Sequence, residues 1–283
     1  MSVVAEHGEQ RQGAIAGVQE PPPLAPGAPL AAGYEVIEHL SRGRDFDVYF
    51  GWSAERECGC AVKTLRPDRV QSASGRRRLL GEGRLLRALS HPHVVRLYEM
   101  HDRPPLLVLE TLTGETLDRM ICGPRRLALA DIATLGLQLC SAIGYLHRQG
   151  FLHLDLKPSN IICDNGQAKL LDLSIARRPG SSKAGVGTPR YMAPEQARGG
   201  TVSPATDVWG MGAVLFCAAA GRLPTAWCDE QPTYPQLWHR AEPLRTHRRV
   251  PAAFGAVIEA ALAPDPDGRP TLGELAGILD PLV

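Results

Sequence analysis

The sequence lacks a charge excess of either sign and lacks an apolar run long enough to cross a bilayer. Its 31 basic and 30 acidic residues leave a net charge of +1, so we expect neither nucleic acid nor an anionic membrane as the main partner. The longest apolar run, Met211 to Ala220, is about half of the roughly 20 residues that a span requires. It predicts a buried core helix. No basic start followed by an apolar block opens the chain, so we expect no secretory signal.

Cysteine is scarce and scattered. The seven cysteines are an odd number, in a chain long enough to bury a core without disulfides. We therefore expect reduced thiols in a cytoplasmic protein. Cys58-Gly59-Cys60 has no second closely spaced Cys/His pair to complete a tetrahedral metal site, and it is interpreted as part of a strand.

Lysine is rarer still, because 27 of the 31 basic residues are arginine and only four are lysine. A lysine that persists against this bias indicates a site that needs a compact ammonium group on a flexible chain rather than a planar guanidinium. Lys63 and Lys157 are the two that stand in recognisable motifs.

The chain divides at about residue 33. Residues 1–33 are rich in proline and glycine and poor in large apolar residues, so they predict a disordered leader. The rest predicts an α+β fold from periodicity and composition. The expected strands are 34–37, 47–52, 60–63, 106–112 and a hairpin of 161–162 with 168–171, and the expected helices are 75–89 and 131–148, the latter with Asp131 as N-cap.

One loop, His153 to Asn160, concentrates chemically useful groups. It holds the carboxylate of Asp155, the ammonium of Lys157 and the amide of Asn160 beside a stiffening proline, Pro158. Such a cluster can accept a proton, neutralise phosphate and bind a metal ion. Taken alone, it is equally compatible with a polar turn between a helix and a strand.

The surrounding motifs decide between these readings. Cys60-Ala61-Val62-Lys63, His91-Pro92, Asp172-Leu173-Ser174 and Gly187-Thr188-Pro189-Arg190-Tyr191-Met192-Ala193-Pro194-Glu195 occur in this order along the chain. With the loop, they resemble the eukaryotic-type (Hanks-type) serine/threonine protein kinases of bacteria. The resemblance covers residues 34–283. It implies a two-lobed protein-kinase-like fold, with an N-lobe of a small antiparallel sheet and one main helix at about 34–112 and a mostly helical C-lobe at about 113–283.

The resemblance also implies roles at the reaction centre. Asp155 would accept the proton of the substrate hydroxyl, Lys157 would contact the transferring phosphate, and Thr188 would bridge the two. Lys63 would bind the nucleotide phosphates while paired with Glu82. The metal, Mg²⁺ or Mn²⁺, would be bound by Asn160 and Asp172.

ATP would lie between the lobes. The resemblance places a glycine-rich flap at Ser41 to Phe46, where only Gly43 remains of three glycines, and we hypothesise that Arg42 or Arg44 supplies charge there instead. The remaining nucleotide contacts that it implies are the apolar faces of Val48, Ala61 and Ile162, the back of the pocket at Leu109, and the hinge backbone at Glu110 and Leu112.

Departures from the family pattern keep two alternatives open. The reduced flap and Ser174, which replaces a glycine, are compatible with a pseudokinase that acts as an ATP-binding or scaffold module. A small-molecule phosphotransferase would share the lobes but not the Met192 to Glu195 platform.

Leu154 stands where the family has an arginine that receives an activating phosphate, so we predict activity without such a switch at Ser181 or Ser182. Protein substrates and a regulatory partner chain are the expected partners.

Overall fold

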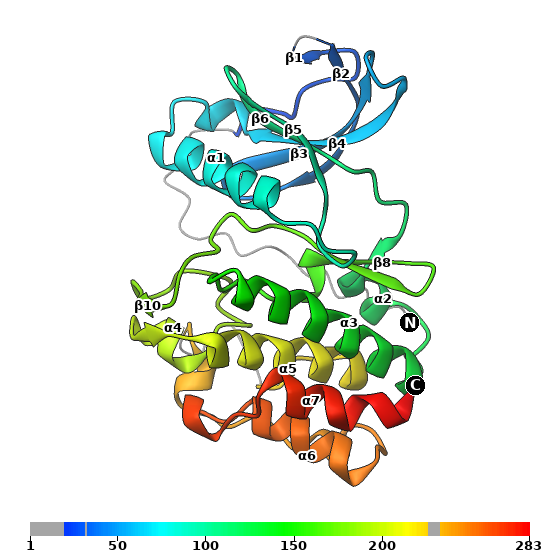
Figure 1. Cartoon of the computed structure of the whole chain (residues 1–283), viewed down its shortest axis with the longest axis vertical. Coiled ribbons are helices and arrows are strands. Elements are labelled where there is room, and N and C mark those ends of the chain that lie inside the picture. The colour runs from blue at the N-terminus through cyan, green and yellow to red at the C-terminus, as the bar shows by residue number, and fades with distance from the viewer. Residues whose placement is uncertain (1–19, 32, 226–232) are drawn as a thin grey trace.

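The computed structural model describes residues 20–31, 33–225 and 233–283. Strands gather at one end of the molecule and helices at the other (Figure 1). The smaller lobe holds a six-stranded antiparallel sheet with the strand order β1-β2-β3-β4-β6-β5. Its strands are β1 Pro29–Ala31, β2 Tyr34–Arg42, β3 Phe46–Ser53, β4 Cys58–Leu65, β5 Leu97–Asp102 and β6 Pro105–Leu109. The predicted strands and their antiparallel pairing are confirmed.

The two faces of this sheet bury different side chains because residues alternate along a strand. Val48 pairs with Lys63 and Phe50 with Ala61, which places all four on the face toward helix α1, Ala73–Ala88. Gly83 lets α1 approach closely, since a Cβ built there would lie 2.6 Å from both Leu107 and Met100. This glycine therefore serves the packing of α1 on the sheet.

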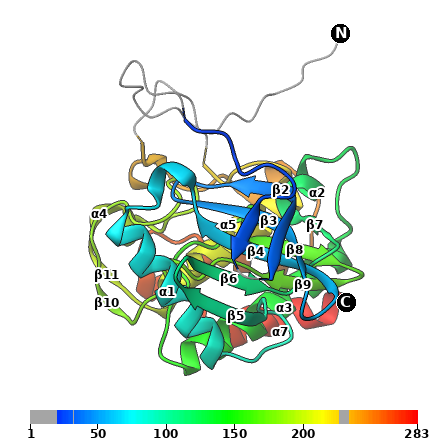
Figure 2. The same ribbon diagram turned by 90° about the horizontal axis from the view of Figure 1, so that it is seen from above.

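The opposite face is covered by the chain that precedes β2. Leu30 is 7% exposed and packs with Tyr34, Val36, Tyr49 and Val62 in a separate apolar cluster. The backbone N–H of Gly27 donates to the Val36 carbonyl at 2.8 Å, and that of Leu24 donates to the Tyr49 hydroxyl at 3.0 Å. Figure 2 shows this segment running over the small lobe to β2.

The prediction of a disordered leader over 1–33 is therefore wrong for residues 20–31, which we call the N-terminal strap. The reason is physical. The strap has too few apolar residues to form a core of its own, but it needs only to cover a sheet face that is already apolar. Residues 1–19 and 32 lie outside the described part of the chain.

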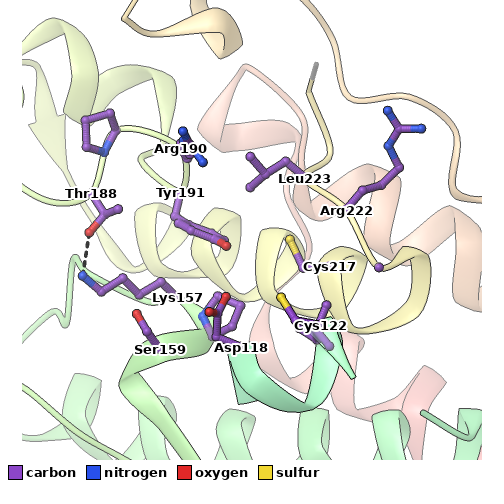
Figure 3. A pocket seen from close by; sticks show the side chains of 14 residues that line it. Asp118, Cys122, Lys157, Ser159, Thr188, Arg190, Tyr191, Cys217, Arg222 and Leu223 are labelled. Atoms are coloured by element: carbon purple, nitrogen blue, oxygen red, sulfur yellow. Dashed lines mark hydrogen bonds between the residues drawn. The ribbon is translucent and has the colours of Figure 1, made fainter. Parts of the chain in front are cut away.

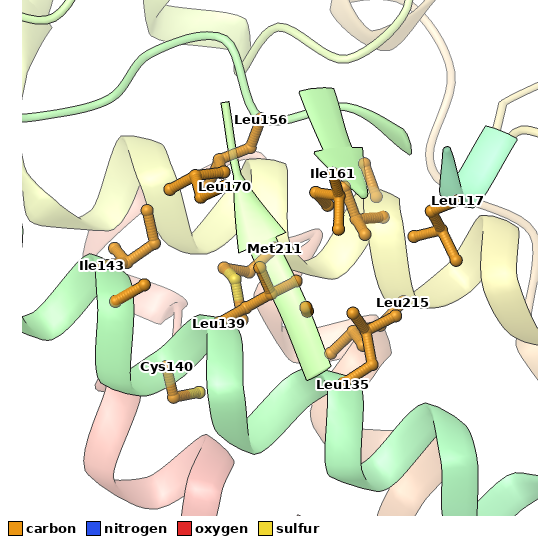
Figure 4. Close-up of a cluster of buried hydrophobic side chains, with 14 of the residues drawn as sticks. Leu117, Leu135, Leu139, Cys140, Ile143, Leu156, Ile161, Leu170, Met211 and Leu215 are labelled. Atoms are coloured by element: carbon orange, nitrogen blue, oxygen red, sulfur yellow. The ribbon is translucent and has the colours of Figure 1, made fainter. Parts of the chain in front are cut away.

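The larger lobe is built on helices α3 and α5, whose facing side chains form its core (Figure 4). Its helices are α2 Leu117–Cys122, α3 Leu129–Arg148, α4 Pro194–Arg198, α5 Pro204–Ala220, α6 Ala252–Ala261 and α7 Leu272–Leu279. The run Met211 to Ala220 is buried throughout, as predicted. The N-cap prediction for Asp131 is wrong, because α3 begins two residues earlier, after Ala128, and Asp131 lies in its first turn.

Among the described residues, one helix, α3, is long and apolar enough to cross a membrane by length and composition. In this protein 50% of that stretch is buried, and α3 packs against α5 and α7. This is the environment of a core helix.

Two small sheets shape the boundary between the lobes and the surface beside it. Strands β7 Glu115–Thr116, β8 Ile161–Asp164 and β9 Gln167–Leu170 form one sheet, which includes the predicted hairpin. Strands β10 Gly180–Ser181 and β11 Thr201–Val202 form the other. The first carries the chain from the His153–Asn160 loop back toward Asp172.

Candidate active site

Lys63 on β4 lies between two carboxylates. Its Nζ donates to both Glu82 oxygens at 3.0 and 2.8 Å and to Asp172 Oδ1 at 2.8 Å. Glu82 comes from α1 and Asp172 from the segment after β9, so the three charges join both lobes. The Leu173 N–H also donates to Glu82 at 3.2 Å. The structure has the Lys63–Glu82 contact that the sequence predicts and adds Asp172 to it.

Burial and mutual attraction set the charges of this cluster. Burial raises the pKa of Glu82 to about 7, and the nearby Lys63 only partly offsets that effect. Burial lowers the pKa of Lys63, but Asp172 and Glu82 outweigh it and leave that pKa above its usual value. For Asp172, Lys63 outweighs burial and holds the pKa well below the usual range. The site therefore keeps a protonated lysine and an ionised Asp172, with Glu82 as its most readily titrated member.

Phe46 completes the surroundings of Lys63. Its ring centroid lies 5.1 Å from Lys63 Nζ and 5.6 Å from the Arg78 guanidinium carbon, distances typical of cation–π contacts. Arg78 also pairs with Asp45. From the sequence, Phe46 was notable only because it stands where the family has a glycine. In the structure its ring contacts Lys63 and Arg78 of α1, so it anchors the flap to both.

The second cluster lies in the His153–Asn160 loop. Thr188 donates to Asp155 Oδ1 at 2.7 Å and accepts from Lys157 Nζ at 2.8 Å (Figure 3 shows the latter bond). Lys157 Nζ is also 3.1 Å from Asp155 Oδ2. Asn160 Nδ2 donates to the Asp155 carbonyl at 2.9 Å. The predicted bridge through Thr188 is present and fixes the orientation of the Asp155 carboxylate.

A buried carboxylate from α5 holds the start of this loop. Asp207 accepts from the backbone N–H groups of His153 at 2.9 Å and Leu154 at 2.8 Å. Leu154 has a φ of +66°, a left-handed conformation that is rare for a leucine. The two hydrogen bonds and the burial of the Leu154 side chain offset this strain. The loop is thus clamped to the helix that forms the centre of the lobe.

The segment after Thr188 is fixed to the same lobe by an ion pair. Arg269 Nη1 and Nη2 each donate to one Glu195 oxygen at 2.8 Å, the two-pronged geometry that favours specific pairing. Gln196, which is buried, donates to the Leu154 carbonyl at 2.7 Å. The platform is therefore tied both to the core and to the loop that carries Asp155.

The residues expected around a nucleotide line the face of the sheet that carries Lys63. Val48 on β3 pairs with Lys63, and Leu109 on β6 pairs with Ala61, which lies two residues before Lys63 on β4. Ile162 lies on β8 across the lobe boundary. The Glu110 side chain turns to Lys169, 2.7 Å away. Within the described residues, neither the Glu110 carbonyl nor the Leu112 N–H has a hydrogen-bond partner, which leaves these two backbone groups available to an adenine.

Arg42 in the flap binds other residues of the protein, whereas we expected Arg42 or Arg44 to supply charge to the phosphates. Two guanidinium nitrogens of Arg42 donate to the two oxygens of Asp47, each at 2.8 Å, and a third nitrogen donates to the Pro21 carbonyl at 2.7 Å. Asp47 is fully buried and also accepts from the Tyr49 hydroxyl at 3.1 Å. Arg42 therefore links β2 to β3 at the base of the flap and ties both strands to the strap. The hypothesis of a phosphate-binding arginine then applies to Arg44, which is exposed.

Ser41 lies near the end of β2, which runs to Arg42, and Gly43 is the first residue of the turn that follows. The Gly43 N–H donates to the Phe46 carbonyl at 2.8 Å, while Arg66 Nη1 reaches the Gly43 carbonyl at 3.3 Å. Arg66 also pairs with Glu20 of the strap at 3.0 Å. Sequence reasoning missed Asp47 and Arg66; the only signal for Asp47 was an acid directly before the Val48 that was expected in the pocket.

Asn160 and Asp172 are compatible with a divalent cation. The Leu171 N–H donates to the Asn160 carbonyl at 2.8 Å, which brings the two residues into one neighbourhood. Amide and carboxylate oxygens are the ligands that Mg²⁺ prefers, and Mg²⁺ commonly takes its remaining ligands from water and phosphate. The described residues contain no group of three or more His, Cys, Asp or Glu side chains placed to hold a metal without such help.

Comparison with known proteins identifies this arrangement. The model of the protein kinase domain matches residues 34–277. Serine/threonine-protein kinase PknB of Mycolicibacterium smegmatis is 33% identical over 263 residues, 85% of this chain and 41% of that protein. The DNA damage-responsive serine/threonine-protein kinase RqkA of Deinococcus radiodurans is 33% identical over 269 residues, 89% of this chain and 39% of that protein. The chain thus spans less than half the length of these curated relatives.

A solved structure agrees at the level of the fold. The kinase domain of Mycobacterium tuberculosis PknI has a TM-score of 0.73 and 23% identity, and the match covers 92% of this chain and 98% of that one. The two lobes and their order along the chain are as the sequence predicted. The chain belongs to the protein kinase domain family.

Proposed function

We propose that this chain is a serine/threonine protein kinase that transfers the γ-phosphoryl group of ATP to protein hydroxyls. The observation that carries the proposal is the pair of linked charge clusters, one joining Lys63 to Glu82 and Asp172 and the other joining Asp155 to Lys157 through Thr188. Phosphoryl transfer needs little covalent help from a protein, so positioned charges of this kind are its main requirement.

Each group has a role that its position supports. Asp155 accepts the proton of the attacking hydroxyl, since Thr188 occupies its Oδ1 and turns the carboxylate. Lys157 neutralises charge on the phosphoryl group in transit. Lys63 binds the α- and β-phosphates, and Glu82 holds its ammonium in place. A bound Mg²⁺ would neutralise phosphate charge and would be held by Asp172 and Asn160.

The nucleotide would lie across the lobe boundary. Its adenine would bond to the Glu110 carbonyl and the Leu112 N–H, between the apolar faces of Val48 and Ala61 above and Ile162 below, with Leu109 behind. Ser41 and Gly43 would lie over the phosphates. Residues 34–283 would form the catalytic domain, acting in the cytoplasm on protein substrates and with a regulatory partner chain.

The rival function is that of a pseudokinase that binds ATP or scaffolds other proteins. Two observations favour it. Asp172 Oδ1 already accepts hydrogen bonds from Lys63 at 2.8 Å and from the Ser174 N–H at 3.1 Å, and the flap has a single glycine, Gly43. The complete set of charged groups at both clusters favours catalysis. A small-molecule phosphotransferase is disfavoured by the Met192 to Glu195 platform, which the ion pair of Glu195 with Arg269 holds in place.

The test is phosphate incorporation from labelled ATP with Mg²⁺ or Mn²⁺, in the full chain, with mass spectrometry to locate the product. Asp155→Asn and Lys63→Ala should each reduce the rate by about a hundredfold or more, because each removes a group that acts on the reacting atoms. Asp131→Asn, an exposed carboxylate on α3, is the matched control and should retain wild-type activity.

ATP binding measured on the same proteins separates the rivals. Wild-type protein that binds ATP without incorporating phosphate into any protein would establish the binding module instead. Phosphate on an antibiotic or sugar but not on protein would establish the small-molecule enzyme.

A further inference from the structure

A cavity of about 360 Å³ opens directly beside the His153–Asn160 loop. Its walls come from α2, the loop itself, the platform after Thr188 and the end of α5 (Figure 3). Lys157 and Thr188, which hold Asp155, form one end of it. A polypeptide that presents a hydroxyl to Asp155 must therefore lay its neighbouring residues along this cavity.

The floor of the cavity is uncharged. It is formed by Ile121 of α2, Cys217 of α5 and Tyr191 of the platform. Burial raises the pKa of Cys217 to about 12, so the thiol stays neutral, and the Tyr191 hydroxyl is hydrogen-bonded to it. The one carboxylate of α5, Asp207, is engaged by the backbone of the loop. The floor thus accepts an apolar side chain.

The charges around the cavity are mostly positive. Among the lining residues that the structure describes, Arg190, Arg222 and Lys157 are basic and Asp118 alone is acidic. The charge of Lys157 is balanced by Asp155, 3.1 Å away. Arg222 is exposed, and no ion pair joins it to another described residue. The part of the rim farthest from the reacting centre therefore has an excess of positive charge.

This inference rests on the proposed function and specifies its substrate class. We propose that the cavity selects protein segments that carry an anionic side chain close to the acceptor serine or threonine, next to an apolar residue that fills the floor. Arg222 is the specificity-determining residue. A segment with basic residues at the same place is disfavoured, because it meets Arg222, which is in no ion pair with another described residue.

The anion can be a carboxylate or a phosphoryl group, and peptide substrates distinguish them. Peptides share one acceptor serine and one apolar neighbour, and they differ in a single residue, which is aspartate, phosphoserine, alanine or lysine, moved in turn through each flanking position. The wild-type chain should show the highest kcat/KM when the anion stands at one defined position. The lysine peptide should be the poorest there.

The decisive variant is Arg222→Glu. It should reduce kcat/KM for the anionic peptide by about fivefold or more, the scale of one partly exposed charge pair, and should raise that of the lysine peptide, so that the order of preference reverses. Loss of folding cannot produce such a gain. Arg245→Glu, an equally exposed arginine outside the cavity, is the control and should leave the preference of wild-type protein unchanged.

The outcomes separate this inference from the proposed function. Transfer to peptides with no preference, or with a preference for lysine, overturns the inference while the kinase activity stands. An anionic preference that survives Arg222→Glu also overturns it. If wild-type protein phosphorylates neither itself nor any peptide, the proposed function fails and the inference fails with it. A higher rate with phosphoserine than with aspartate assigns the site to previously phosphorylated substrates.

Discussion

At the scale of single residues, opposing effects act on the charge of Glu82 in the Lys63 cluster. Burial favours its neutral form, whereas Lys63 and the Leu173 N–H favour the carboxylate. The result is a pKa raised to about 7. The pKa of Lys63 is raised and that of Asp172 is lowered, so both groups stay charged near neutral pH. Within the cluster of Lys63, Glu82 and Asp172, Glu82 should therefore be the group that gains or loses a proton near neutral pH.

The first prediction concerns the pH dependence of activity. As pH rises through about 7, Glu82 ionises and its pairing with Lys63 strengthens, so kcat/KM for ATP should rise. Glu82→Gln should abolish this limb of the profile and lower activity by about tenfold, since a charged hydrogen bond is lost. The measurement is the profile of kcat/KM against pH, with Glu115→Gln, an exposed glutamate, as control.

The same group should affect stability with the opposite sign. The pKa of Glu82 is higher in the folded protein than the ordinary value of 4.5, so the folded state binds this proton more tightly than the unfolded state does. Its contribution to stability is present at low pH and is lost as pH rises from about 4.5 to 7. Thermal unfolding of Glu82→Gln should lack this component. Identical activity and stability profiles in wild type and Glu82→Gln would contradict both statements.

The residues of the two charge clusters could be predicted because each lies in a motif with fixed spacing. Lys63 meets Glu82, and Thr188 joins Asp155 to Lys157, as expected, whereas the contact of Lys63 with Asp172 was not predicted. Arg42 was misassigned because its partner is set by strand register: β2 and β3 place Arg42 opposite Asp47, and Asp47 is buried. A pattern of residue types does not reveal which carboxylate will lose its water and require a cation.

At the scale of elements, the N-terminal strap turns the outer face of the small sheet into a second core. Leu30 packs there with residues of β2, β3 and β4. The strap also meets the flap directly, through Pro21 with Arg42, and indirectly, through the ion pair of Glu20 with Arg66, which donates to the Gly43 carbonyl. The sequence could not predict this because the strap's own composition is that of a disordered segment. What orders it is the apolar face that it covers.

Leu30→Ala should therefore lower the free energy of unfolding by about 2 kcal/mol, the lower end of the range for a buried leucine. Leu40→Ala is the matched control, since Leu40 on β2 is 52% exposed. Its loss should be within about 0.5 kcal/mol, as for other surface substitutions. Denaturant unfolding of the full chain measures both. Equal losses at the two positions would mean that the strap does not stabilise the sheet.

At the scale of the whole molecule, the two lobes and their order were predictable, whereas the cavity beside Lys157 was not. The motifs of a kinase occur locally in the chain, and each is recognisable by itself. The cavity is assembled from α2, the loop, the platform and the end of α5, which span residues 118–223. Its charge depends on which side chains converge, a property of the packed lobe rather than of any one stretch of sequence.

The whole-molecule packing also explains how the segment between Asp172 and Thr188 is held. Leu154 is 5% exposed and forms an apolar cluster with Leu152 and Val202, with Ile175 packed against it. Strand β10 of the segment pairs with β11. In this arrangement, apolar contact occupies the place where an arginine would otherwise receive a phosphate. The segment is in position without one.

The last prediction follows from this packing. Ser181→Ala/Ser182→Ala should keep the kinase rate within about twofold of wild type, because no phosphate on either residue is required to position the segment. Ser182 is 8% exposed and its N–H is bonded to the Gly200 carbonyl at 3.0 Å, so its hydroxyl is also poorly accessible to another enzyme. The rate should be measured on protein treated with a phosphatase and on untreated protein. A large loss in the double alanine variant, restored by aspartate at either position, would show that a phosphate switch operates despite Leu154.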